Sequence, residues 1–160
     1  IKVRAVHEAL KSKNLQSEFF VLSDDSGICV DALGGAPGIF SARFSGADAT
    51  DASNREKLAV SLRALGLEES PAHYTAAIAL KCDLGEFCTH GFMHGTAITQ
   101  QRGQNGFGYD FMFIPRGFDR TIGELPAEVK FEISHRTKGL ALMRILLKNL
   151  EKQMRLAKFH

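Results

Sequence analysis

Apolar residues recur at helical spacing in three segments of the chain, which predicts three amphipathic helices. The first covers residues 1 to about 13. The second starts at Asp51, a fair N-cap, and ends at Gly66. The third is a long terminal helix that starts at Thr137, and its apolar residues repeat at intervals of three and four positions as far as Met154.

Strict alternation of apolar and polar residues from His73 to Cys82 predicts a half-buried strand. A tight turn over residues 83–86 and a returning strand over residues 87–99 make this a long antiparallel hairpin. Shorter apolar runs predict further extended segments at residues 18–22, 28–33 and 111–114. Because strands and helices are mixed and one hairpin is long, we expect an α/β or α+β fold with a mixed central sheet.

Length and composition indicate one globular domain covering residues 1–160. Hydrophobic residues form 44% of the chain and charged residues 24%, which is typical of a globular protein rather than a disordered or fibrous one. The net charge of +2 is too small to indicate binding to nucleic acid or to a membrane. There is no apolar run of about 18 residues and no signal-peptide pattern. The three cysteines form no CxxC pair, which favours a reducing compartment and therefore the cytoplasm.

Two adjacent carboxylates, Asp24 and Asp25, follow the apolar run 18–22, where a strand is expected to enter a loop. Mg²⁺ is usually bound by one or two protein carboxylates together with substrate oxygens, so this pair is a candidate metal site for a triphosphate. Ser26 and Gly27, directly after the pair, would allow a phosphate to approach closely. The alternative is an Asx-type turn, in which both carboxylates accept hydrogen bonds from nearby backbone amides.

The segment Gly106–Asp110 is a second candidate, a glycine-rich loop that leads into an apolar run. Two glycines flanking Phe107 would let the backbone approach a flat ligand while the ring stacks on it. Asp110 could orient a base or a water molecule. The alternative is a bulge or turn with Phe107 in the core, where Asp110 only caps the turn.

Lys130 and the tripeptide Ser134–Arg136 precede the long terminal helix. Ser134 can cap this helix, whereas the charges of His135 and Arg136 are disfavoured by the positive end of the helix dipole. Two cations in such a place indicate an anion or an acceptor-rich ligand edge nearby, and Arg136 could donate two hydrogen bonds to a 6-oxopurine. Lys130 could bind a phosphate or a base carbonyl, or be an ordinary surface lysine.

Other kinds of active site find no support in the sequence. On a strand, His90 and His94 would lie on one face but about 13 Å apart, too far for one zinc ion. The chain contains no G-x-S-x-G and no P-loop lysine motif, so neither a serine hydrolase nor a Walker-type NTPase is indicated.

Five blocks resemble, in their order and spacing, the Ham1/RdgB-type non-canonical purine NTP pyrophosphatases, the ITPase family. These blocks are Ser23–Gly27, Gly34–Gly38, Ser41–Arg43, Gly106–Asp110 and Ser134–Arg136. The resemblance covers essentially the whole chain. It implies Mg²⁺-dependent hydrolysis of ITP, dITP and XTP to the monophosphate and pyrophosphate, which removes deaminated purines from the nucleotide pool. It also implies a homodimer and an elongated α/β fold with two lobes and an active-site cleft between them.

The resemblance further implies roles for individual residues. Asp25 matches the catalytic proton acceptor of the family, which is also a Mg²⁺ ligand, and Asp24 is expected in the shell of the same metal. The expected substrate-binding residues are Ser26, Arg43, Phe107, Gly108, Tyr109, Asp110, Lys130, His135 and Arg136.

One departure from the family pattern affects the expected activity. Family members begin with a strand and a Thr/Ser-x-Asn-x-x-Lys loop that grips the triphosphate, and then provide a glutamate that binds Mg²⁺. Neither block occurs here, so we expect the chain to begin just after them. A chain that keeps the base pocket but lacks this phosphate grip could bind nucleotides without catalysis, which is one alternative. A second alternative, a related pyrophosphatase that acts on modified pyrimidines, fits Ser134–Arg136 less well.

Overall fold

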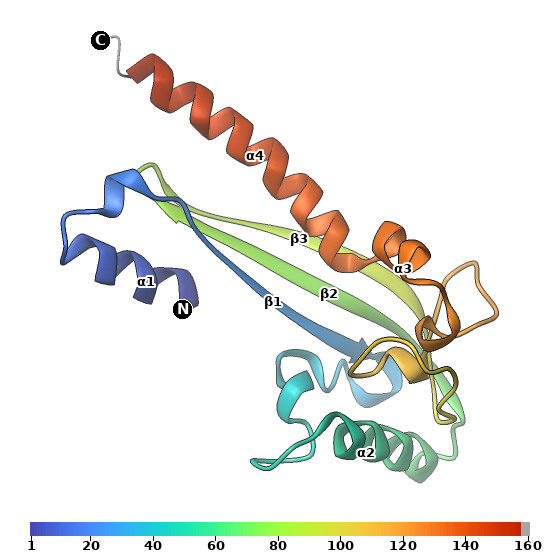
Figure 1. Cartoon of the computed structure of the whole chain (residues 1–160). Coiled ribbons are helices and arrows are strands. Elements are labelled where there is room, and N and C mark those ends of the chain that lie inside the picture. Colours follow the sequence, from blue (N-terminus) through green and yellow to red (C-terminus); the bar gives the residue numbers. More distant parts are fainter. Residues whose placement is uncertain (158–160) are drawn as a thin grey trace.

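The computed structural model describes residues 1–157, and its centre is a four-stranded sheet in the order β1-β2-β3-β4 (Figure 1). The strands are β1 (Val21–Val30), β2 (Glu69–Cys82), β3 (Gly85–Ile98) and β4 (Phe113–Pro115). Every neighbouring pair is antiparallel. The predicted α/β fold is confirmed, but in the described residues its sheet is antiparallel rather than mixed, because the long connection after β1 returns the chain in the opposite direction. Residues 158–160 of the predicted domain lie outside the described residues.

Within residues 1–157, four α-helices accompany the sheet: α1 (Lys2–Lys11), α2 (Asp51–Ala64), α3 (Ala127–Ile133) and α4 (His135–Ala157). Short 3₁₀ helices are η1 (Gln16–Glu18), η2 (Asp31–Leu33), η3 (Gly38–Arg43), η4 (Asp110–Met112) and η5 (Ile122–Glu124). The three predicted helices are confirmed as α1, α2 and α4, and α3 is additional. Among the described residues, no helix is both long and apolar enough to cross a membrane.

The N-cap of α2 is Thr50 rather than the predicted Asp51. The Thr50 hydroxyl accepts a hydrogen bond from the Ser53 amide at 3.1 Å, and the Ser53 hydroxyl accepts one from the Thr50 amide at 2.9 Å. This reciprocal arrangement is a capping box. Asp51 is therefore the first helical residue, and its carboxylate remains available for other contacts.

The predicted long hairpin is confirmed and forms the middle of the sheet. β2 and β3 pair along their full length, from Glu69 with Ile98 to Cys82 with Gly85. Alternate residues of β2 are buried throughout, as the apolar pattern predicted. Figure 1 shows α4 running along one side of the hairpin, with α1 on the other side. Two buried clusters, one around α2 and one between the hairpin and α4, form the cores of two lobes.

β1 differs most from the sequence prediction. One continuous strand replaces the expected strand, loop and second extended segment, so Asp24 and Asp25 stand in mid-strand opposite Ile78 and Ala77 of β2. The Asx-turn alternative is therefore also wrong. Pairing with the long β2 overrides the low strand propensity of Asp, Ser and Gly. The run at 111–114 is likewise only partly extended, because η4 precedes β4.

The start of α4 packs directly on the backbone of β3, and glycines make this approach possible. A Cβ atom on Gly91 would lie 2.0 Å from the carbonyl oxygen of His135 and 2.4 Å from the amide nitrogen of Gly139. Thr89 donates a hydrogen bond to the Gly139 carbonyl oxygen at 2.9 Å. The backbone of β3 thus determines where His135 and the first turn of α4 lie.

Candidate active site

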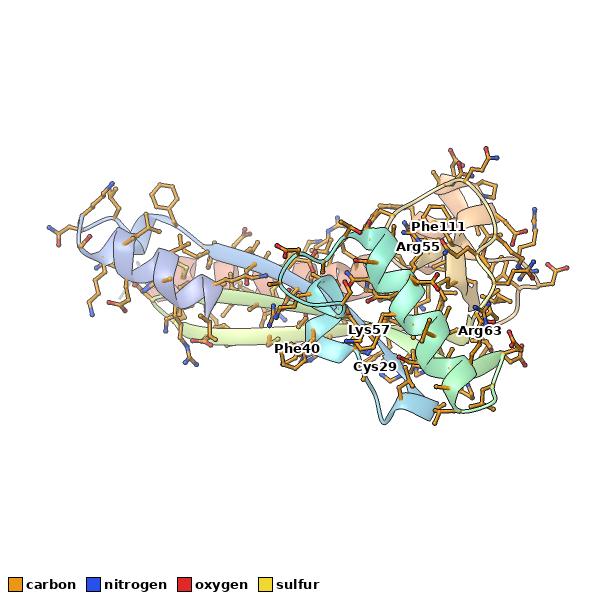
Figure 2. The ribbon with its side chains drawn as sticks, turned by 90° about the horizontal axis from the view of Figure 1, so that it is seen from below. Cys29, Phe40, Arg55, Lys57, Arg63 and Phe111 are labelled. Atoms are coloured by element: carbon orange, nitrogen blue, oxygen red, sulfur yellow. The ribbon has the colours of Figure 1, made fainter. Side chains whose placement is uncertain are left out.

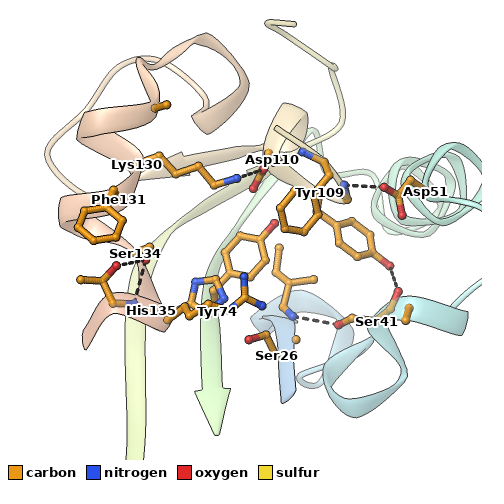
Figure 3. A pocket seen from close by; sticks show the side chains of 18 of the residues that line it. Ser26, Ser41, Asp51, Tyr74, Tyr109, Asp110, Lys130, Phe131, Ser134 and His135 are labelled. Atoms are coloured by element: carbon orange, nitrogen blue, oxygen red, sulfur yellow. Dashed lines mark hydrogen bonds and ion pairs between the residues drawn. The ribbon is translucent and has the colours of Figure 1, made fainter. Parts of the chain in front are cut away.

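A cavity of about 440 Å³ opens between β1, β2, the loop Gly106–Asp110 and the junction of α3 with α4 (Figure 3). Most of the expected substrate-binding residues line it together: Ser26, Phe107, Gly108, Tyr109, Asp110, Lys130, His135 and Arg136. The fold therefore brings segments that are far apart in the chain to one place.

His135 stacks on Tyr74 of β2 at one side of the cavity. The ring centroids are 4.8 Å apart and the planes are inclined by only 10°. Burial, followed by the charge of the neighbouring Arg136, lowers the pKa of His135 to about 4, so its imidazole is neutral at pH 7. Its Nδ1 atom is buried and has no hydrogen-bond partner among the described residues. A ring nitrogen in this state can bond to the polar edge of a ligand.

Phe107 is 62% exposed, so the alternative that places it in the core is wrong. The Lys130 ammonium lies 4.5 Å from the centroid of its ring and forms an ion pair with Asp110. Oδ2 of Asp110 also accepts a hydrogen bond from the Phe107 amide at 3.0 Å. Asp110 therefore closes the turn and holds Lys130 over one face of the Phe107 ring, and the exposed remainder of the ring can stack on a flat ligand.

Tyr109 anchors the loop that presents Phe107. Its hydroxyl donates a hydrogen bond to the Ser41 carbonyl oxygen at 2.8 Å, and burial raises the pKa of Tyr109. Between the two aromatic residues, Gly108 has a φ of 56°, a left-handed conformation that glycine adopts without strain. One ring is therefore held by the protein while the other is exposed at the cavity.

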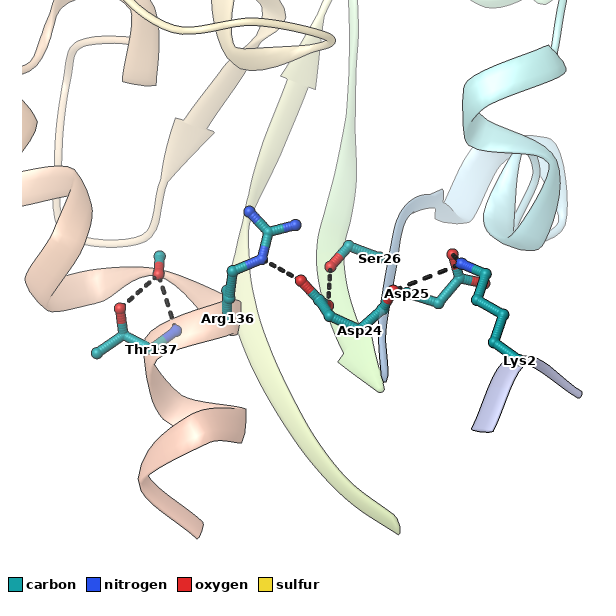
Figure 4. A network of polar contacts seen from close by, with 7 residues as sticks. Lys2, Asp24, Asp25, Ser26, Arg136 and Thr137 are labelled. Carbon is teal, nitrogen blue, oxygen red and sulfur yellow. Dashed lines mark hydrogen bonds and ion pairs between the residues drawn. The ribbon is translucent and has the colours of Figure 1, made fainter. Parts of the chain in front are cut away.

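Asp24 forms an ion pair with Arg136, the second residue of α4 (Figure 4). Nε of Arg136 donates to Oδ2 of Asp24, and the Ser26 hydroxyl donates to Oδ1 at 3.3 Å. Asp24 and Ser26 are two positions apart on β1 and so share one face of the sheet. The anion expected beside the cations of this helix start is thus a carboxylate of the chain itself.

Asp25 points to the opposite face of β1 and does not line the cavity. Its Oδ1 accepts a hydrogen bond from Nζ of Lys2 at 3.0 Å, and its side chain is 70% exposed. The described residues contain no group of three or more His, Cys, Asp or Glu side chains that could hold a metal ion. Mg²⁺ needs only one or two carboxylates and completes its shell with water and phosphate oxygens, so Asp25 fits it. Asp24 fits it less well, because both its oxygens bind other side chains.

A model of the Ham1 family matches residues 1–146. This chain belongs to the Ham1 family. A dITP/XTP pyrophosphatase of Campylobacter fetus is 59% identical over 152 residues, which cover 95% of this chain and 74% of the relative. A dITP/XTP pyrophosphatase of Campylobacter jejuni is 54% identical over 152 residues, with 95% and 75% covered. A solved HAM1 protein from Coxiella burnetii has a TM-score of 0.77 and 34% identity, over 88% of this chain and 74% of that one.

Within this Ham1-family site, Arg43 is the expected substrate-binding residue that the fold places elsewhere. Its guanidinium lies 5.0 Å from the centroid of the Phe40 ring. Both side chains line a separate hollow together with Pro37 and Phe44. Arg43 therefore does not contribute to the cavity that contains His135.

The Ham1-family cavity also contains residues that sequence reasoning had not connected with chemistry. Tyr74 was recognised only as an inward-facing strand residue, and Asp51 only as a helix cap. Phe131 of α3 lines the cavity although it is 70% exposed. No local signal marks these residues, because each acquires its position from contacts with distant segments.

Proposed function

We propose that this chain hydrolyses the deaminated purine nucleoside triphosphates ITP, dITP and XTP to the monophosphate and pyrophosphate. Two relatives that are 59% and 54% identical to it are named dITP/XTP pyrophosphatases. The observation that supports the proposal best is the composition of the cavity. It combines the exposed ring of Phe107 with the polar groups of Lys130, His135 and Arg136. A flat base with hydrogen-bond acceptors at its edge suits such a lining.

Selection against adenine follows from the hydrogen-bond donors that line the cavity. Lys130 and Arg136 can only donate hydrogen bonds. The oxygen at position 6 of hypoxanthine or xanthine accepts from such a donor, whereas the 6-amino group of adenine would place a donor against a donor. A buried unpaired donor costs about 1–3 kcal/mol, which corresponds to a preference of about 5- to 150-fold.

Asp25 is the proposed catalytic residue. Its exposed carboxylate accepts a proton from the water molecule that attacks the α-phosphorus, and pyrophosphate is the leaving group. The same carboxylate would hold Mg²⁺, with Asp24 joining only if it released Arg136 or Ser26. Bound Mg²⁺ neutralises charge on the phosphate oxygens.

The proposal extends to a homodimer in the cytoplasm. Ile39 and Phe40 of η3 are 78% and 53% exposed, an apolar surface that suits a second copy of the chain. The thiols of Cys29, Cys82 and Cys88 are free, in keeping with a reducing compartment. Light scattering during gel filtration measures the mass, and a monomer at micromolar concentration would contradict the dimer.

Release of pyrophosphate from ITP, XTP and ATP in the presence of Mg²⁺ tests the proposed activity. We expect rapid release from ITP and XTP and little from ATP. ITP binding without release would favour the nucleotide-binding fragment, and a preference for modified pyrimidine triphosphates would favour the pyrimidine alternative. Either result would refute the proposal.

A further inference from the structure

Helix α2 holds the backbone of one residue of the cavity loop, Gly108, through two hydrogen bonds. Oδ2 of Asp51 accepts a hydrogen bond from the Gly108 amide at 2.8 Å, and Nη1 of Arg55 donates one to the Gly108 carbonyl oxygen at 2.9 Å. Asp51 and Arg55 are four residues apart in α2, so they lie on the same face of the helix, one turn apart. Because each bond involves a charged side chain, both are stronger than a bond between neutral groups.

Arg55 also contacts the chain on both sides of this loop, at Gln101 before it and at Phe111 after it. Its Nε donates a hydrogen bond to Oε1 of Gln101 at 2.7 Å, and its guanidinium lies 4.8 Å from the centroid of the Phe111 ring. Figure 2 shows Arg55 directed at Phe111, with Arg63 at the other end of α2. One side chain thus links the beginning, middle and end of the segment that contains Phe107.

We propose that Asp51 and Arg55 are positioning residues that fix Phe107 at the place where the base of the substrate stacks. This inference rests on the proposed pyrophosphatase function. Phe107 is mostly exposed, so its own packing cannot hold it. Phe107 directly precedes Gly108 in the chain, so a shift of the Gly108 backbone moves the Phe107 ring.

The expected effect is on substrate binding rather than on hydrolysis. Asp51 and Arg55 act on the loop that would contact the base, whereas Asp25, the proposed catalytic residue, lies on a different face of the sheet. Loss of one charge-assisted hydrogen bond corresponds to about a tenfold change in an equilibrium. Asp51→Ala and Arg55→Ala should therefore each raise KM for ITP about tenfold and leave kcat within about twofold.

Three further variants distinguish positioning from a general loss of structure. Asp51→Asn keeps an oxygen acceptor for the Gly108 amide and should restore most of the affinity. Arg63→Ala removes an exposed arginine from the same helix, whose ion pair with Glu68 is 3.9 Å long, and should change nothing. The double variant Asp51→Ala/Arg55→Ala should raise KM by less than the product of the two single increases, because both side chains hold the backbone of the same residue, Gly108.

A second readout does not depend on activity. The chain contains no tryptophan, so Phe107→Trp introduces a single tryptophan at the loop, which can be excited without exciting the two tyrosines. We expect lower fluorescence anisotropy when Asp51→Ala or Arg55→Ala is added to this variant, and no change with Arg63→Ala. If Arg55→Ala does not fold, Arg55→Lys repeats the test, because an ammonium cannot contact Gln101 and Gly108 as the guanidinium does.

Unchanged anisotropy in the Asp51→Ala and Arg55→Ala variants, or a fall in their kcat at constant KM, would refute the positioning role of these two residues. If the unmodified chain releases no pyrophosphate from ITP, the proposed function fails. The anisotropy comparison still decides whether α2 positions the loop.

Discussion

Replacing Gly91 by alanine should disturb the candidate active site through the start of α4, which packs on this residue. The new Cβ atom would lie 2.0 Å from the His135 carbonyl oxygen, so that oxygen must retreat by about 1.4 Å to reach an acceptable 3.4 Å. The new Cβ atom would also lie 2.4 Å from the Gly139 amide nitrogen. This nitrogen and the His135 oxygen belong to the backbone of α4, so neither can rotate away as a side-chain atom could. The first turn of the helix must therefore move, together with His135 and Arg136.

Two measurements follow from this displacement. Overpacking of this kind costs about 1–3 kcal/mol, which lowers the melting temperature of a chain of this size by about 2–12 °C. A displacement of about 1 Å in a binding group can cost up to about a hundredfold in rate or affinity. We therefore expect kcat/KM for ITP to fall by at least about tenfold at a temperature where the Gly91→Ala variant remains folded.

Gly139→Ala is the matched control, because it adds a methyl group to the same contact from the helix side. Its Cβ would lie 3.1 Å from Cγ1 of Ile78, which can shift, and 3.3 Å from the Gly91 amide nitrogen, which needs to give by only about 0.1 Å to reach 3.4 Å. Alanine also favours the helix by about 1 kcal/mol relative to glycine. This variant should melt within a few degrees of the unmodified chain. If Gly91→Ala is equally stable and equally active, the proposed link between the β3 backbone and the position of His135 is wrong.

Three other perturbations test the roles assigned to polar residues. Asp25→Asn should leave the melting temperature unchanged, because the side chain is exposed, and should lower kcat by at least about a hundredfold. The control is Asp48→Asn, which changes another exposed aspartate. Near-normal turnover by Asp25→Asn would contradict the proposed catalytic role of Asp25. Arg136→Ala should mainly raise KM for ITP. A lower kcat at constant KM would contradict the proposal that Arg136 donates hydrogen bonds to the base of the substrate. Because the folded pKa of His135, about 4, is below its unfolded value near 6.5, the unfolded chain binds more protons between these pH values. The free energy of unfolding should therefore fall as the pH drops through this window, by up to about 1.4 kcal/mol per pH unit, and His135→Gln should show a smaller slope in denaturant titrations.

Elements with strong periodicity could be predicted from the sequence. The alternation along β2 extends over many residues, and the repeats in α2 and α4 leave little ambiguity between helix and strand. β1 could not be predicted, because Asp24 to Gly27 have low strand propensity and become extended only through pairing with β2. The stacking of His135 on Tyr74 is equally invisible in the sequence, since it depends on how closely α4 approaches the sheet.

The charge pattern at the start of α4 predicted part of the electrostatics of the site. Two cations at the start of α4 are disfavoured by the helix dipole, and the structure relieves this cost in two ways. His135 has a lowered pKa and is neutral, so it adds no charge at pH 7. Arg136 keeps its charge and pairs with Asp24. The charge pattern therefore indicated a compensating group correctly, but only the fold identifies it as a carboxylate from β1.

The alternation of side chains along β1 gives its two neighbouring carboxylates different surroundings. Asp24 faces α4 and holds Arg136 at the cavity, whereas Asp25 faces α1 and keeps an exposed carboxylate beside Lys2. In the proposed function, one strand thus joins recognition of the base to the chemistry at the phosphate. A slip of one residue in the pairing of β1 with β2 would exchange these two faces and remove both contacts. The register that sets Asp24 opposite Ile78 and Asp25 opposite Ala77 is therefore as important to this site as the carboxylates themselves.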